Sequence, residues 1–113
     1  GGKRTAAGRF PAVLMARYEV YPNPAGAGYL LDVQADLLDG LNTRVVVPLL
    51  PPDAAPLPAR RLNPLFDIAE TPHVMVTQFM AAVPLTMLGR PVSSLIGRDT
   101  EITNALDMLL SGI

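Results

Sequence analysis

Proline and glycine divide most of this chain into segments too short for long helices. Twelve prolines and nine glycines are spread over 113 residues. Five of the prolines fall between residues 51 and 64, where they exclude both a helix and a central strand. We expect an extended linker within the domain there, with Arg60 and Arg61 in solvent. The segments between the breaks alternate apolar and polar residues, which predicts short β-strands.

This alternation places the strands and the connections between them. We expect strands at residues 17–21, 29–38, 41–49, 65–69 and 73–80, and a helical turn at 93–97. Residues 22–28 hold two prolines and two glycines and predict a loop, and Asp39-Gly40 predicts a hairpin turn. Pro48 has no amide hydrogen to donate, so its strand is expected to end there or to lie at a sheet edge.

One amphipathic helix is predicted near residue 113. Asp99 or Thr100 can cap its first turn, because a short side-chain oxygen accepts from unpaired amides. Apolar residues then recur on one face, at Ile102, Ala105, Leu106 and Leu109. Ser111-Gly112 ends the helix, since glycine readily adopts the left-handed conformation. The fold class is therefore mainly β with a C-terminal helix, a small barrel of antiparallel strands.

Composition limits the classes of function. The chain is 50% hydrophobic and 17% charged, which predicts a homodimer or an obligate partner that covers apolar surface. A net charge of −1 without a basic stripe argues against direct nucleic-acid binding. The absence of cysteine excludes disulfides and is compatible with the cytoplasm. No apolar run is long enough for a membrane span.

The N-terminal residues differ from the rest of the chain. Residues 1–14 are small, basic and without pattern, and we interpret them as a flexible extension that comes from a tag or an upstream start. Met15 is then a plausible true start. The functional domain is expected to cover residues 15–113.

Few residues are candidates for catalysis or for binding a metal ion or cofactor. His73 is the one histidine, and Arg44 and Asp67 are conceivable companions for RNA cleavage, although a lone histidine at a strand edge is usually structural. Asp32 and Asp36 would lie about 13 Å apart along a strand, too far to share one ion, so no metal site is expected. No nucleotide fingerprint is present, and no cofactor is expected. The methionines at 75, 80, 87 and 108 are expected to fill the core, with Met108 also near a dimer contact.

Four segments in order resemble the CcdB family of toxins. They are residues 29–39, residues 44–49, residues 80–89, and residues 104–110 followed by Gly112-Ile113. The resemblance runs over roughly residues 15–113. It implies an SH3-like barrel of the kind that CcdB and MazF toxins share, a homodimer, and a CcdA-like antitoxin as partner.

The resemblance also implies a function without catalysis. CcdB toxins insert the ends of their paired C-terminal helices into the A-subunit dimer of DNA gyrase and trap the complex in which DNA is cleaved. The family's tip is Trp-Gly-Ile, and the matching target-binding residues here are Ser111, Gly112 and Ile113. Because Ser111 stands in place of an aromatic anchor, weaker gyrase poisoning is expected. The alternatives are a MazF/PemK-like ribonuclease on the same fold and a non-toxic relative that still binds antitoxin.

Overall fold

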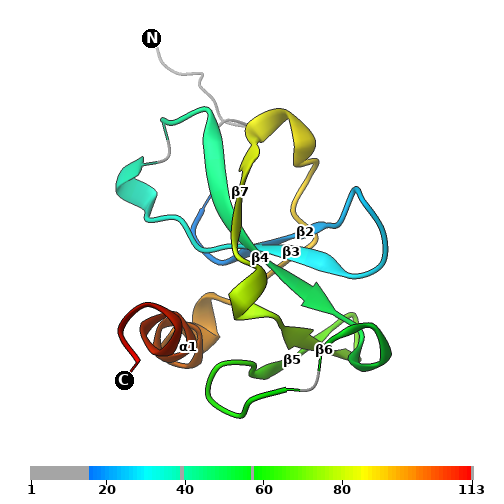
Figure 1. Cartoon of the computed structure of the whole chain (residues 1–113). Coiled ribbons are helices and arrows are strands. Elements are labelled where there is room, and N and C mark those ends of the chain that lie inside the picture. The colour runs from blue at the N-terminus through cyan, green and yellow to red at the C-terminus, as the bar shows by residue number, and fades with distance from the viewer. Residues whose placement is uncertain (1–15, 39, 57, 113) are drawn as a thin grey trace, which may run out of the picture.

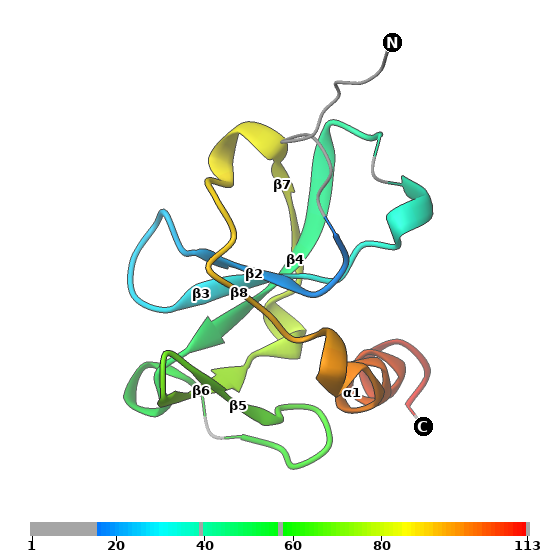
Figure 2. The same ribbon diagram turned by 180° about the vertical axis from the view of Figure 1, so that it is seen from behind.

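The fold is a strongly bent antiparallel sheet with one helix packed against it (Figures 1 and 2). The computed structural model describes residues 16–38, 40–56 and 58–112. The expected N-terminal extension, Met15, the Asp39 half of the expected Asp39-Gly40 turn, and Ile113 lie outside the described residues. Within them, the expected fold class, a small and nearly closed barrel with a C-terminal helix, is confirmed.

Within the described residues, seven strands form the sheet, in the order β5-β6-β4-β3-β2-β8, with β7 also paired to β4. Every pairing between them is antiparallel. The strands are β2 (Glu19–Pro22), β3 (Tyr29–Asp32), β4 (Thr43–Leu50), β5 (Leu65–Ile68), β6 (Thr71–Met75), β7 (Ala81–Pro84) and β8 (Ser93–Ser94), and the helix is α1 (Asp99–Ser111). The same described ranges contain five short 3₁₀ turns, at Asp36–Leu38, Pro52–Ala54, Thr77–Phe79, Leu85–Met87 and Ile96–Arg98.

Strand β4 is the central element of the barrel. One of its sides pairs with β3, while its other side pairs with β7 at residues 43–46 and with β6 at residues 49–50. The expectation that Pro48 ends the strand or marks an edge is therefore wrong. Its carbonyl accepts from the Val76 amide at 2.9 Å, and the amide and carbonyl of one strand residue face the same neighbour. The missing donor of Pro48 thus falls where β4 changes partners, so no ladder bond is lost.

Strand β3 ends at Asp32, well before the expected end at residue 38. The backbone amide of Val45 donates to the side-chain oxygen of Gln34 at 3.0 Å, and the Gln34 side-chain amide donates to the Leu38 carbonyl at 2.8 Å. These bonds replace ladder bonds, because a side chain can satisfy backbone groups in place of a strand. The chain then turns at Asp36–Leu38.

The strand expected at residues 73–80 begins earlier and is shorter, as β6. Its continuation is a 3₁₀ turn in which Thr77 Oγ1 donates to the Leu62 carbonyl. The Asn63 side-chain amide donates to the Met75 carbonyl at 3.0 Å and to Gln78 at 2.7 Å. These bonds fix the segment before β5 against the end of β6. The described residues of 51–64 form a connection without an α-helix or a strand, as expected, although Pro52–Ala54 make a 3₁₀ turn in it. The loop expected at 22–28 begins one residue later, because Pro22, the last residue of β2, still pairs with Tyr29 of β3.

Helix α1 buries the predicted stripe against the barrel. Ile102 and Ala105 are fully buried and Leu106 nearly so, all in the main core with Phe66 and Val47, while Leu109 is half-buried. The predicted cap is wrong, because Asp99 is already helical and the residue before it, Arg98, makes no side-chain cap. The 3₁₀ turn Ile96–Arg98 leads directly into the helix.

The methionines divide between core and surface. Met75 is fully buried and Met80 packs against the main core, as expected. Met87 is 45% exposed, so its expected core role is wrong, because its 3₁₀ turn follows Pro84 and leaves Leu88 as the buried residue. Met108 is half-buried on α1.

Candidate target-binding surface

The end of α1 is open to solvent. Ser111 is the last helical residue and is exposed, as is Gly112. Gly112 has the predicted left-handed conformation, with φ of 72°, and its amide donates to the Met108 carbonyl at 3.0 Å. Two of the three predicted tip residues are therefore accessible to a partner, and the third, Ile113, lies outside the described residues.

A groove runs beside this helix end. Its volume is about 460 Å³, and its walls come from the segment between β3 and β4, from β4 itself, from Met80 and from α1. In Figures 1 and 2 the turn Asp36–Leu38 and α1 lie on the same side of the barrel. Most wall residues are apolar, with Arg17 and Asp107 among the polar ones. The apolar wall residues are Val33, Ala35, Leu38, Leu41, Val45, Met80, Leu106 and Leu110.

Exposed leucines continue the apolar surface of the groove. Leu110 is 69% exposed, Leu41 49% and Leu38 47%, and Leu37, next to Leu38 in the chain, is 94% exposed. We call the three that line the groove, Leu38, Leu41 and Leu110, the leucine patch. An apolar cluster left in water on a small domain is typical of a binding surface. The patch places large apolar side chains close to the end of α1.

The leucine patch does not follow from the sequence pattern. Residues 37 and 38 fall in a segment whose alternation predicts a strand, in which alternate side chains would point into the barrel. Two adjacent leucines directly before Asp39-Gly40 are the available signal, because a turn there leaves both side chains outside the sheet.

Met108, the predicted dimer contact, keeps part of its surface exposed near the end of α1. Its side chain is half-buried, so it can contact both this barrel and a second copy. A role in dimer formation stays a prediction.

The three residues considered for RNA cleavage are not brought together. Arg44 is fully buried, and its Nη2 lies 2.6 Å from Oδ2 of Asp32, which is also fully buried. The guanidinium is therefore out of reach of a phosphate. Burial raises the pKa of Asp32, although the hydrogen bond from Arg44 acts in the opposite direction.

His73 and Asp67 lie on neighbouring strands but have different surroundings. His73 is buried in β6 and its Nδ1 lies 2.8 Å from the Thr71 carbonyl oxygen, whereas Asp67 is exposed in β5 opposite Pro72. Phe66, not Asp67, is the cross-strand neighbour of His73. Since successive strand residues point to opposite faces, the carboxylate and the imidazole cannot act on one bond.

The aspartates considered for a metal site are also separated. Asp32 pairs with Arg44, and Asp36 Oδ1 accepts from the Arg17 backbone amide at 2.7 Å. Within the described ranges, no three histidine, cysteine, aspartate or glutamate side chains are placed to hold one ion. Nor does any helix in these ranges have the length and apolar character required to cross a membrane.

Comparisons with known proteins agree with the architecture. A solved structure described as an endoribonuclease in complex with its cognate antitoxin, from a mycobacterial species, has a TM-score of 0.69. That alignment covers 85% of this chain and 94% of the other at 18% identity, which shows a shared fold. The family model described as CcdB protein matches residues 17–112. Because that match spans most of the chain, including the leucine patch and α1, this protein belongs to the CcdB family.

Proposed function

We propose that this protein is the toxin of a type II toxin-antitoxin system and acts on DNA gyrase without catalysing a reaction. The observation that carries the proposal is the exposed end of α1 beside the leucine patch. A toxin that works by binding needs such a surface, whereas it needs no catalytic residues. Family membership supports gyrase as the target to test first.

The physical basis is differential binding. A toxin that binds the DNA-cleaved state of gyrase more tightly than the other states increases the population of that state. Burying one leucine side chain contributes about 1.5 to 3 kcal/mol. The three residues of the leucine patch therefore offer substantial binding energy, which can offset part of the loss caused by serine in place of the family tryptophan at position 111.

An antitoxin is the second proposed partner. The structural relative at 18% identity was solved with its cognate antitoxin, which supports an antitoxin for this chain as well. The exposed apolar surface also favours a protein that covers it when the toxin is inactive. A relative that kept only antitoxin binding would have the same surface, so gyrase activity has to be measured directly.

The decisive experiment measures cleaved DNA that accumulates with gyrase from the same organism. We expect the wild-type protein to increase the fraction of cleaved DNA. The Leu110→Asp variant should require about 10-fold to 100-fold more protein for the same effect, because a charge replaces a leucine that the complex with gyrase would bury. Met87→Asp is the matched control, since Met87 is 45% exposed on a different part of the barrel, and it should behave as the wild type. Equal loss in both variants, or no cleavage with the wild type, would refute the proposed site or target.

Position 111 gives an independent test of the same surface. Ser111→Trp should lower the concentration needed for cleavage about 10-fold or more, because a central aromatic anchor contributes about 2 kcal/mol.

Incubation of total RNA with the wild-type protein and with His73→Ala tests the enzymatic alternative. RNA cleavage that depends on His73 would overturn the assignment of a non-catalytic toxin.

A further inference from the structure

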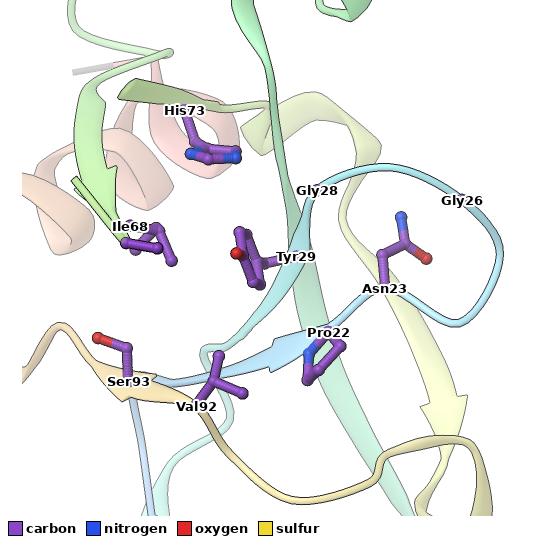
Figure 3. Close-up of a pocket in the computed structure, with 10 residues that line it drawn as sticks. Pro22, Asn23, Gly26, Gly28, Tyr29, Ile68, His73, Val92 and Ser93 are labelled. Carbon is purple, nitrogen blue, oxygen red and sulfur yellow. The ribbon is translucent and has the colours of Figure 1, made fainter. Parts of the chain in front are cut away.

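A second cavity opens on another part of the barrel and shares no wall residue with the groove beside α1 (Figure 3). Its volume is about 550 Å³. The loop after β2, the first residue of β3, the end of β5, His73 of β6 and the start of β8 form its walls. It therefore lies where several strand ends meet, and the volume is within the range of small-molecule sites, about 300 to 1,000 Å³.

His73 lines this cavity, and one hydrogen bond fixes the tautomer of its neutral ring. Its side chain is only 6% exposed, and its Nδ1 lies 2.8 Å from the Thr71 carbonyl oxygen. A carbonyl can only accept, so Nδ1 carries the hydrogen and, in the neutral ring, Nε2 presents a lone pair. No hydrogen bond from the described residues occupies Nε2.

The surrounding groups suit a flat ring. The Tyr29 and His73 rings meet edge to face, with centroids 5.1 Å apart at 70°, and both lie at the cavity in Figure 3. Ile68, Val92 and Pro22 add apolar walls. Aromatic rings prefer such edge-to-face partners, so a further ring can pack against this pair.

Charge and polarity restrict the ligand further. No lysine, arginine, aspartate or glutamate among the described residues lines the cavity, so a phosphate, carboxylate or ammonium would lose water without gaining an oppositely charged side chain as partner. The side chain of Asn23 is already engaged, because its Nδ2 donates to the Ala27 carbonyl and its Oδ1 accepts from the Ala25 amide.

We propose that this cavity binds a neutral aromatic ring with a single N–H donor, of the indole class, and that the N–H bonds to Nε2 of His73. The proposal does not depend on the toxin function. The same chemistry can come from a free indole compound or from a tryptophan side chain of a partner protein.

The test uses amide chemical shifts of the isotope-labelled full-length protein. Indole and indene have nearly the same shape, but indene lacks the N–H. We expect saturable shifts around Tyr29, His73 and Ser93 with indole, and at least about fivefold weaker binding of indene. No saturable shifts, equal binding of the two compounds, or shifts centred on Leu110 would each overturn the proposal.

Two variants test the assigned contacts. His73→Phe keeps a ring but removes the acceptor, so indole binding should weaken about fivefold to tenfold while indene binding stays the same. Val92→Trp alters a residue that is 55% exposed and should fill the cavity, which abolishes binding of both compounds. The Val92→Trp variant also tests the site independently if His73→Phe does not fold. Unchanged indole binding in Val92→Trp would contradict the site.

The two sources are separated with capped amino acids. Binding of N-acetyltryptophanamide at least as tight as that of indole would indicate a tryptophan of a partner protein, because the backbone groups are then accommodated. Binding of indole alone would indicate a free compound. N-acetylphenylalaninamide is the control without a donor and should bind no more tightly than indene.

Discussion

Among the glycines that the structure describes, Gly28 is the one at which an added Cβ would clash with the backbone. Its φ is +86°, and a Cβ added there would lie 2.2 Å from the Leu49 carbonyl oxygen of β4. Gly28→Ala should therefore lower the free energy of unfolding by about 2 to 4 kcal/mol, because it adds both backbone strain and a backbone clash. Gly26→Ala in the same loop is the control, since nothing lies within 4 Å of its added Cβ. Gly26→Ala should change the free energy of unfolding, measured by urea denaturation, by less than about 0.5 kcal/mol.

The Asp32–Arg44 pair predicts a coupled pattern of stability changes. Arg44→Met leaves the Asp32 carboxylate buried and unpaired, and Asp32→Asn does the same to the guanidinium. Each single change should destabilise the fold by about 3 to 5 kcal/mol. The double variant removes both charges and keeps an acceptor for the backbone amide of Gln34, which donates to Asp32 Oδ1 at 3.0 Å.

The double variant should therefore cost less than the sum of the two single changes, by at least about 2 kcal/mol. Urea denaturation of the four proteins measures this difference. Additive effects would mean that the two charges do not interact in the folded protein.

At the scale of elements, α1 combines buried core positions with an exposed end that we propose for binding. Ile102 is fully buried, so Ile102→Ala should lower the free energy of unfolding by about 2 to 5 kcal/mol. Leu110 is 69% exposed, so Leu110→Ala should change it by less than about 0.5 kcal/mol while weakening binding of the target. A large loss of stability in Leu110→Ala, measured by thermal unfolding, would place that side chain in the core instead.

The elements that the sequence predicts well are those with a local cause. The proline-rich and glycine-rich loop after β2, the linker at 51–64 and the apolar stripe of α1 follow from residues adjacent in the chain or one turn apart. The ends of β3 and β6 escape prediction because alternation continues beyond them. Both ends depend on side chains such as Gln34 and Asn63, which bond backbone groups about a dozen residues away.

The same distinction applies to the site and to Pro48. The exposed Ser111-Gly112 end is predictable, because a left-handed glycine after an apolar stripe is a local pattern. The leucine patch depends on where the 36–38 turn meets α1, which no spacing along the chain reveals. The missing donor of Pro48 is visible in the sequence, whereas its consequence depends on which strands lie beside it.

For the whole molecule, we predict a dimer at micromolar concentration. Met108 is half-buried near the exposed helix end, and two copies related by a twofold axis would place it opposite an identical surface. Met108→Glu should shift the protein to monomers in sedimentation velocity, because a charged side chain would be buried in the interface. Thr100→Glu, at an exposed position near the start of α1, should remain dimeric. A monomeric wild type would contradict the prediction.

The change of partners along β4 has a consequence for how the barrel assembles. Strands β2, β3 and β4 are neighbours both in sequence and in space, so they can form with short loop closures. Strand β7 can then pair with the other side of β4 before Pro48, and β6 can pair with it after Pro48. We therefore expect the β2-β3-β4 meander to form in the rate-limiting step of folding. The strands of the second half of the chain would pair with β4 afterwards.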